Sequence, residues 1–152
     1  MSEPKVVSCL NCGQKTRIRS AAGGVPHCPN CAKPLPWLTE AGIPDFGPVA
    51  ENSPIPVLID FWAPWCGPCR IVAPAVERLS EELAGQMKVV KVNTDLAPGL
   101  QERFGVRGIP TLVLMDGGKE RDRVVGALNL NALRQWVEQR LPAAAKNQPN
   151  VK

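Results

Sequence analysis

Short runs of apolar residues recur through the second half of the chain, and their spacing predicts strands. Residues 57–63 form a mostly apolar run rich in β-branched and aromatic side chains, which is typical of a buried strand. Residues 87–93 alternate between polar and apolar positions, and residues 111–115 are again apolar, so both are predicted strands. Residues 116–119 read Asp-Gly-Gly-Lys, a hairpin-turn signal that predicts a returning strand over residues 121–125.

Helical patterns fill the spaces between these strands. A helix is predicted to begin near Cys69 and to continue past a kink at Pro74. A short helix is predicted over residues 98–104, and an amphipathic helix over residues 129–141 with Asn129 as its N-cap. The order strand, helix, strand, helix, strand, strand, helix predicts an α/β fold in which a mixed central sheet is covered by helices on both faces.

The junction between the first of these strands and its helix carries two thiols. Residues 65–69 read Trp-Cys-Gly-Pro-Cys, and positions i and i+3 lie on one helix face, close enough for a disulfide. Cys66 is predicted at the helix N-terminus, where free N–H groups and the macrodipole lower the pKa of a thiol. Cys69, one turn inside, is expected to be more buried and to act second. A structural disulfide or half of a zinc site is the alternative, which the neighbouring tryptophans and strand disfavour.

Four segments together resemble the thioredoxin family in both order and spacing. They are residues 60–63 (DFWA), 65–69 (WCGPC), 91–95 (KVNTD) and 106–111 (VRGIPT). The match covers about the last hundred residues. The resemblance implies a thioredoxin fold and a disulfide reductase with a redox-active disulfide, which serves electron transport and cell redox homeostasis. It also implies recharging by thioredoxin reductase at the expense of NADPH.

The resemblance assigns roles to particular residues. Cys66 resembles the nucleophile that forms the mixed disulfide with substrate, and Cys69 the resolving thiol. Asp60 resembles a buried acid that assists proton transfer to and from Cys69, and burial should raise the pKa of such a carboxylate. Lys91 resembles the charge partner of that acid. A hydrogen-bonded carboxylate without a catalytic part and a solvated strand lysine are the alternatives for Asp60 and Lys91.

The same resemblance implies a substrate-binding rim. Ile109 and Pro110 resemble a cis-proline turn that presents the Ile109 backbone to an extended substrate segment. Without the resemblance, Pro110 would be interpreted as an ordinary turn residue, because cis bonds are uncommon. The other rim residues are Trp62, Trp65, Gly67, Pro68, Gly108 and Gly126. Simple core packing is the alternative for Trp62.

The beginning of the chain holds a second cysteine motif. Two CxxC pairs separated by fifteen residues predict a four-thiolate Zn²⁺ site built from two knuckles. The predicted ligands are Cys9, Cys12, Cys28 and Cys31. A segment of about 35 residues cannot bury enough surface to fold alone, so the metal would supply about 10–16 kcal/mol of folding energy. Disulfides or free thiols are the alternative.

Two neighbours of these cysteines matter less for the predicted ligand set. Gly13 relaxes the backbone after the first pair. His27 beside Cys28 could replace a thiolate, but four cysteines already fill the site, so we interpret it as a bystander. Thioredoxins with such an appended ribbon form a second bacterial type within the family, the thioredoxin 2 type, which this chain resembles.

These patterns divide the chain into parts. Residues 1–36 are the predicted zinc ribbon, and residues 37–55 a Pro-rich linker with at most a short strand and one short helix. Residues 56–142 form the predicted thioredoxin core, and residues 143–152 a flexible tail. Residues 37–55 show only weak sequence signals for the first strand and the long first helix that are usual in the family.

Charge and composition restrict the classes of binding partner and the cellular compartment that we expect. The formal net charge is +4, and residues 1–36 hold five Lys/Arg against one Glu. Nucleic-acid binding is disfavoured, because four thiolates on Zn²⁺ bring a charge of −2 and no aromatic residue is interleaved with the basic ones. No basic leader with an apolar core and no membrane-spanning run is present, and zinc-binding thiols favour the cytoplasm.

Two functions from different classes fit the sequence. The first is a protein-disulfide reductase, and the alternative is a zinc-dependent interaction or holdase module with secondary redox activity. An oxidase or isomerase is disfavoured, because Gly67 and Pro68 between the thiols resemble the reducing members of the family. The zinc site is predicted to be structural or redox-regulatory; the regulatory hypothesis is that zinc loss alters stability or partner choice.

Overall fold

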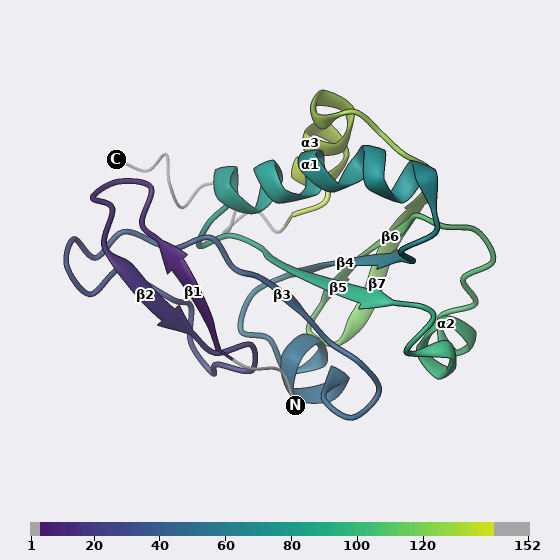
Figure 1. The fold of residues 1–152 in the computed structure, drawn as a ribbon, viewed down its shortest axis with the longest axis horizontal. Helices are drawn as coiled ribbons and strands as arrows, with labels where there is room; N and C mark the ends of the chain where they lie inside the picture. Colours follow the sequence, from purple (N-terminus) through teal and green to yellow (C-terminus); the bar gives the residue numbers. More distant parts are fainter. Residues whose placement is uncertain (1–3, 142–152) are drawn as a thin grey trace.

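The structure of the chain is a computed structural model, which describes residues 4–141. Five of its strands form one mixed sheet in the order β3-β5-β4-β6-β7 (Figure 1). The strands are β3 (Leu38–Glu40), β4 (Val57–Trp62), β5 (Lys88–Asn93), β6 (Thr111–Asp116) and β7 (Lys119–Val125). Strands β3 and β4 run parallel to β5, whereas β6 runs antiparallel to β4 and β7 to β6. The tail predicted over residues 143–152 lies outside the described residues.

Helices cover both faces of this sheet, which confirms the predicted fold class. One face carries α1 (Gly67–Glu82) and α3 (Leu130–Glu138), which lie together in Figure 1. The opposite face carries α2 (Pro98–Arg103) and a single π-helical turn, η1 (Gly47–Glu51). Among the described residues, none of the helices has the length and apolar character needed to cross a bilayer.

The alternation of side chains along each strand decides which residues face which helices. Leu58, Val89 and Leu112 are completely buried in the same cluster as the apolar stripe of α1 and α3. Ile59 and Val90, one position further along, are buried on the side of η1 and α2. Each such side chain contributes about 1.5–3 kcal/mol on burial, so a one-residue shift in register would be strongly unfavourable. Asp60 therefore lies on the face that α1 covers.

Local signals explain where the helices begin and where the hairpin turns. Helix α1 begins at Gly67 with Cys66 as its N-cap, two residues before the predicted start, and continues through Pro74. In α3 the N-cap Asn129 accepts a hydrogen bond of 2.8 Å from a backbone N–H, as its sequence position predicts. The turn between β6 and β7 places Gly117 and Gly118 at φ +62° and +79°, the backbone that a type I′ hairpin requires.

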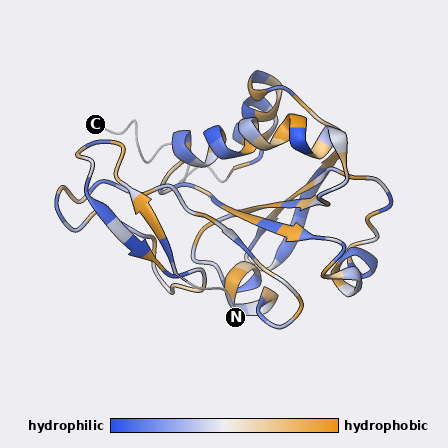
Figure 2. Ribbon diagram, in the orientation of Figure 1, coloured by the Kyte–Doolittle hydropathy of each residue, from blue (hydrophilic) through white to orange (hydrophobic). Residues whose placement is uncertain are grey.

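The N-terminal cysteine segment forms a small separate unit beside β3. Its hairpin consists of β1 (Lys5–Ser8) and β2 (Lys15–Ile18), of which β1 is mostly hydrophobic and β2 mostly hydrophilic (Figures 1 and 2). Ile18 and Leu35 are buried together with Cys9, Cys28 and Trp37. We refer to residues 4–36 of this unit as the ribbon.

A buried lysine joins the ribbon to the sheet. Lys88 of β5 is completely buried, and its ammonium donates to the carbonyl oxygens of Ser20 and Val49, the latter at 2.6 Å. The same ammonium lies 3.9 Å from the ring centroid of Trp37, a cation–π contact. Burial lowers the pKa of Lys88 to about 8. The ribbon, the segment after it and η1 are therefore held by one side chain.

Residues 37–55 contain a three-residue strand and one helical turn, the short elements that the sequence predicts for this segment. Their apolar side chains are buried, since Trp37, Phe46, Val49 and Ala50 are each no more than 2% exposed. Trp37 packs with the ribbon, and the other three pack in the core on the η1 and α2 side of the sheet. Pairing of β3 with β5 also makes this segment the edge of the sheet. The segment therefore packs as an integral layer, although it lacks a long helix.

Candidate redox centre and metal site

The two thiols of the Trp-Cys-Gly-Pro-Cys turn are joined in the structure. Cys66 and Cys69 form a disulfide, with their Cα atoms 5.3 Å apart. The backbone N–H of Cys69 donates to Cys66 Sγ at 3.2 Å, because Cys66 caps the N-terminus of α1, where the first N–H groups lack helical partners. In the reduced protein this contact and the helix dipole stabilise a negative charge on Cys66 Sγ.

Burial does not distinguish the two cysteines in this oxidised state. Both residues are 4% exposed, so the expectation that Cys69 is more buried than Cys66 is not met. The reason is that the disulfide draws both sulfurs against a small apolar cluster with Ala63, Trp62 and Ile109. Their positions at the helix terminus, and not their burial, therefore distinguish the two sulfurs.

Asp60 lies on the α1 face of the sheet and is 1% exposed. Its Oδ1 atom has no hydrogen-bond partner among the described residues. Burial raises the pKa of Asp60 to about 6, and the positive charge of Lys91 partly opposes this increase. A buried carboxyl with a pKa near neutrality can accept and return a proton under physiological conditions.

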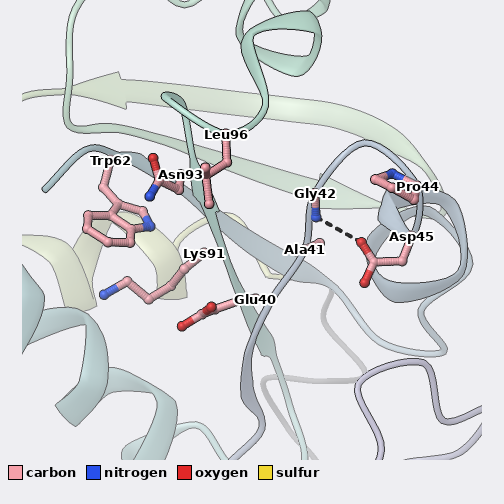
Figure 3. A pocket seen from close by; sticks show the side chains of 9 residues that line it. All are labelled: Glu40, Ala41, Gly42, Pro44, Asp45, Trp62, Lys91, Asn93 and Leu96. Carbon is pink, nitrogen blue, oxygen red and sulfur yellow. Dashed lines mark hydrogen bonds between the residues drawn. The ribbon is translucent and has the colours of Figure 1, made fainter. Parts of the chain in front are cut away.

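Lys91 occupies the paired position on β5, directly beside Asp60. Its Nζ lies 5.1 Å from the ring centroid of Trp62. Both side chains line a cavity of about 490 Å³, which Figure 3 shows from close by. The other lining residues are Glu40, Ala41, Gly42, Pro44, Asp45, Asn93 and Leu96. Lys91 is thus a half-buried residue at the wall of this cavity.

The loop before β6 lies against the disulfide. The peptide bond between Ile109 and Pro110 is cis, as the family resemblance implies. The Ile109 carbonyl oxygen lies 3.7 Å from Cys66 Sγ. The N–H of Gly126, which has a φ of +110°, donates to the Pro110 carbonyl at 2.9 Å, and Thr111 Oγ1 donates to the Gly108 carbonyl. These bonds hold the loop next to the sulfurs.

The rest of the rim is formed by the turn itself. Trp65 is 66% exposed beside Cys66, and its Nε1 donates to Asp95 Oδ1 at 3.1 Å. Arg70 donates twice to the Pro64 carbonyl, at 2.8 and 3.3 Å, which ties α1 to the preceding turn. Gly67 and Pro68 form the first turn of α1, on this same surface.

Sequence reasoning assigned no role to Asp95 or Arg70. A signal for Asp95 was present, because it follows β5 and Trp65 follows β4. Those two strands are parallel neighbours, so their carboxyl ends meet at one edge of the sheet. No comparable signal identified Arg70, whose partner is a backbone carbonyl.

The four ribbon cysteines converge on one point. The Sγ atoms of Cys9, Cys12, Cys28 and Cys31 all lie within 4.8 Å of one another. Cys9 Sγ and Cys31 Sγ are 3.6 Å apart, and Cys12 Sγ and Cys28 Sγ are 3.5 Å apart. Tetrahedral ligands about 2.3 Å from a Zn²⁺ ion would be about 3.8 Å apart, whereas a disulfide needs about 2.05 Å. The spacing fits four thiolates around one metal ion.

The two knuckles repeat the same backbone pattern. After each CxxC pair, the N–H of the next residue donates at 2.8 Å to the carbonyl of the first cysteine, from Gly13 to Cys9 and from Ala32 to Cys28. Gly13 and Ala32 have φ values of +80° and +68°, the left-handed region. The sequence indicated this requirement at Gly13 but not at Ala32.

Asparagine side chains favour the ionised form of two of these thiols. Asn30 Nδ2 donates to Cys12 Sγ at 3.4 Å, and this bond lowers the pKa of Cys12. A hydrogen bond from Asn11 lowers the pKa of Cys31 to about 6. Burial raises the pKa of Cys28 to about 11, so a bound cation would be needed to keep that thiolate ionised near pH 7.

His27 lies beside Cys28 in the chain, but its ring is engaged elsewhere. Its Nδ1 donates to the Val25 carbonyl oxygen at 2.8 Å. Within the part of the chain that the structure describes, the metal-capable cluster consists of the four cysteines.

Ala32 provides a test of the knuckle geometry. Ala32→Gly is expected to stabilise the ribbon by about 0.5–1 kcal/mol, because glycine adopts the left-handed region without the Cβ clash. Gly13→Ala is the matched opposite change and should destabilise by about 1–2 kcal/mol. Thermal unfolding of the metal-loaded protein measures both. A lower melting temperature for Ala32→Gly would contradict this account.

Asp60 provides a test through pH. Its native pKa of about 6 lies above the ordinary value of 3.8, so the native state binds more protons than the unfolded state between these values, and stability falls as the pH rises through this window. Asp60→Asn in the oxidised protein is therefore expected to raise the free energy of unfolding at pH 8 by about 2–3 kcal/mol. The gain should largely disappear near pH 3.5.

Denaturant unfolding at both pH values measures this difference. Asp116→Asn is the control, because Asp116 lies in a partly exposed ion pair with Arg121 at 3.8 Å and should change stability by less than about 1 kcal/mol. An equal gain for Asp60→Asn at pH 3.5 and pH 8 would show that charge burial is not its cause.

Comparison with known proteins extends these observations. A family model described as Thioredoxin matches residues 44–139. Thioredoxin 1 of Nostoc sp. is 51% identical over 90 residues, which cover 59% of this chain and 84% of the relative. A thioredoxin of Synechocystis sp. is 50% identical over 90 residues with the same coverage. Chloroplastic thioredoxin M4 of Arabidopsis thaliana is 34% identical over 142 residues, covering 90% of this chain and 72% of that protein.

Proposed function

Because this chain belongs to the thioredoxin family of disulfide oxidoreductases, we propose that it reduces disulfide bonds in other proteins through Cys66 and Cys69. The observation that carries this proposal is the disulfide between Cys66 and Cys69 at the N-terminus of α1, with a backbone N–H directed at Cys66 Sγ. Within residues 4–141, the backbone N–H bond is made to Cys66 Sγ and not to Cys69 Sγ, which supports Cys66 as the attacking thiolate.

The reaction transfers two electrons in two exchange steps. The Cys66 thiolate attacks one sulfur of the substrate disulfide; a bond between Cys66 and that sulfur forms, and the other substrate sulfur leaves as a thiolate. The Cys69 thiolate then attacks Cys66 Sγ, which closes the Cys66–Cys69 disulfide and releases the second substrate sulfur as a thiolate. The substrate disulfide is reduced and the protein dithiol is oxidised.

Asp60 is proposed to accept the proton that Cys69 loses before it attacks. Cys69 lies in the first turn of α1, and Asp60 lies on the sheet face that α1 covers. A pKa of about 6 suits Asp60 to exchange a proton near neutral pH. Lys91 is proposed as its charge partner, because the Lys91 charge lowers the pKa of Asp60.

The substrate is proposed to be an extended protein segment that pairs with the Ile109 backbone. The Ile109 carbonyl lies beside Cys66 Sγ, so a segment bonded to it would hold its own disulfide near the attacking sulfur. Trp65, which is 66% exposed, offers apolar contact area on the same rim. Thioredoxin reductase is proposed to restore the dithiol with electrons from NADPH.

The ribbon is proposed to bind one Zn²⁺ through Cys9, Cys12, Cys28 and Cys31. Four thiolates are the donor set that structural zinc sites use, and the Sγ spacing suits it. The metal would neutralise part of the thiolate charge and hold the two knuckles together, which is a structural role. A redox-regulatory role is the alternative, and measuring activity after zinc loss tests it. Reduced zinc thiolates support a cytoplasmic location.

Reduction of insulin tests the proposed activity. With dithiothreitol as electron source, the protein is expected to accelerate insulin precipitation in proportion to its concentration. With thioredoxin reductase, the same reaction should consume one NADPH for each disulfide reduced, since both carry two electrons. An unchanged precipitation rate would overturn the reductase assignment and leave the zinc-dependent interaction module as the alternative.

A further inference from the structure

The ribbon and the redox pair lie at opposite ends of α1. The ribbon contacts the chain just after the C-terminal end of this helix, where a Cβ atom on Gly85 would lie 2.8 Å from the Pro34 side chain. Cys66 caps the other end, 16 helical residues away, which is about 24 Å at 1.5 Å per residue. Figure 1 shows the same separation. In this fold the Cys66 sulfur therefore does not reach the ribbon cysteines of its own chain.

The ribbon sulfurs are close enough to one another to be converted into disulfides. Cys12 Sγ lies 3.5 Å from Cys28 Sγ. The corresponding distance between Cys9 Sγ and Cys31 Sγ is 3.6 Å. A disulfide needs about 2.05 Å, so a movement of about 1.5 Å would bring either pair to bonding distance. A peroxide is the oxidant: two thiolates, two protons and one H₂O₂ give one disulfide and two waters, which removes two ligands from a bound Zn²⁺.

Each of these pairs contains one buried cysteine and one that is more accessible. Cys9 and Cys28 are buried, whereas Cys31 is half-buried and Cys12 is exposed. Thiol–disulfide exchange begins with attack of a thiolate on one sulfur of the disulfide, so the attacked sulfur must be accessible. In an oxidised ribbon, Cys12 is the sulfur most open to attack, and Cys28 is the sulfur that leaves.

The chain around Cys12 has the properties that the proposed substrate rim would bind. Within the described residues, the N–H and carbonyl groups of Asn11 and Cys12 make no backbone–backbone hydrogen bond, so they are available to pair with the Ile109 backbone. Leu10 of the same knuckle is 66% exposed and offers an apolar side chain to the exposed Trp65. The first knuckle therefore combines an accessible sulfur, free backbone groups and an apolar neighbour.

We propose that the oxidised ribbon of a second copy of this chain is a substrate of the Cys66–Cys69 pair. This inference rests on the proposed function. The Cys66 thiolate forms a bond with Cys12 Sγ of the second copy, and Cys28 of that copy leaves as a thiolate. The Cys69 thiolate then attacks Cys66 Sγ, which closes the Cys66–Cys69 disulfide and releases Cys12 as a thiolate. One dithiol is oxidised for each ribbon disulfide reduced, so two turnovers restore the four thiolates.

A Cys66→Ser, Cys69→Ser double variant supplies the substrate, because it cannot reduce its own ribbon. The variant is oxidised with one equivalent of hydrogen peroxide per disulfide, freed of Zn²⁺, and mixed with limiting dithiothreitol, fresh Zn²⁺ and a small amount of wild-type protein. A chromophoric indicator follows zinc uptake. The rate is expected to rise in proportion to the wild-type concentration and to exceed the rate with dithiothreitol alone by about tenfold or more. The Cys66→Ser single variant is the control catalyst and should give no acceleration.

A trapped intermediate identifies the attacked sulfur. With Cys69→Ser as the catalyst, peptide mapping by mass spectrometry is expected to find Cys66 joined to Cys12 of the oxidised double variant. Leu10→Ser in the substrate should raise its KM by about threefold or more, because an apolar contact with the rim is lost. Val6→Ser on β1 is the matched control, since Val6 is also exposed, at 62%, and should leave KM unchanged.

Three results would overturn the proposal. The first is zinc uptake at the rate of dithiothreitol alone when the same wild-type preparation reduces insulin, a result that leaves the proposed function intact. The second is trapping on the buried Cys9 or Cys28. The third is recovery of the oxidised wild-type protein at a rate independent of its concentration, which would assign the reduction to the same chain. If neither insulin nor the ribbon is reduced, the proposed function itself fails.

Discussion

Cys66→Ser is expected to abolish protein-disulfide reduction, whereas Cys69→Ser is expected to stop the reaction at a covalent intermediate. A serine hydroxyl is not ionised near neutral pH, so the rate with Cys66→Ser should fall by about a thousandfold or more. In Cys69→Ser the Cys66 thiolate still receives the N–H of residue 69 and the helix dipole, so it can attack. Without a resolving thiol, the mixed disulfide should persist.

Insulin precipitation measures the loss of activity, and mass spectrometry under non-reducing conditions detects the trapped complex. Cys66→Ser is the matched control for trapping, because it retains one thiol of the pair at the same turn. A stable mixed disulfide with Cys66→Ser and none with Cys69→Ser would show that the order of attack is the reverse of the one proposed.

Removal of the metal is expected to unfold the ribbon. Its hairpin and two knuckles bury little beyond Cys9, Ile18, Cys28 and Leu35, which pack against Trp37, so most of their stability must come from the metal–thiolate bonds. Zinc binding supplies about 10–16 kcal/mol in small domains of this kind. Chelation should therefore expose all four ribbon thiols together and release the contact of Ser20 with Lys88.

A metal assay combined with a thiol count tests this prediction. Protein purified under reducing conditions should contain one Zn²⁺ per chain, and chelation of the oxidised form should make four of the six cysteines newly reactive as thiols. Trp37 fluorescence should change at the same time, because Lys88 packs on its ring. A Cys66→Ser, Cys69→Ser double variant is the control and should retain its metal. Metal-free protein with four unreactive thiols would contradict the zinc assignment.

Loss of the metal also separates the two roles considered for the ribbon. If the ribbon is only structural, insulin reduction by the chelated protein should be unchanged. If it is regulatory, zinc release by oxidation should alter the rate of insulin reduction. Such an effect would reach the sheet through contacts that join the ribbon to it, such as those of Lys5 with Glu40 and of Ser20 with Lys88.

The sequence alone was enough to predict those features of this protein that depend on residues close together along the chain. Strand, turn and helix signals over residues 57–138 are short-range, because alternation, caps and turn glycines act between neighbours along the chain. The two cysteine motifs are local for the same reason: two positions of a CxxC are necessarily close. The spacing of the cysteines along the chain was therefore enough to predict the four-cysteine cluster and the disulfide pair. The cis peptide at Pro110 was expected only through the family resemblance, since local preference favours trans.

Tertiary structure decided everything that depends on residues distant in sequence. The equal burial of Cys66 and Cys69 follows from packing against Ile109, 40 or more positions away, and the deep burial of Lys88 follows from Ser20, Val49 and Trp37 closing over it. Glu40, Lys91 and Asp60 lie at paired positions only because β3 and β4 flank β5 in register. Strand order and register are set by the burial of whole faces, a collective free energy that no local segment of the chain contains.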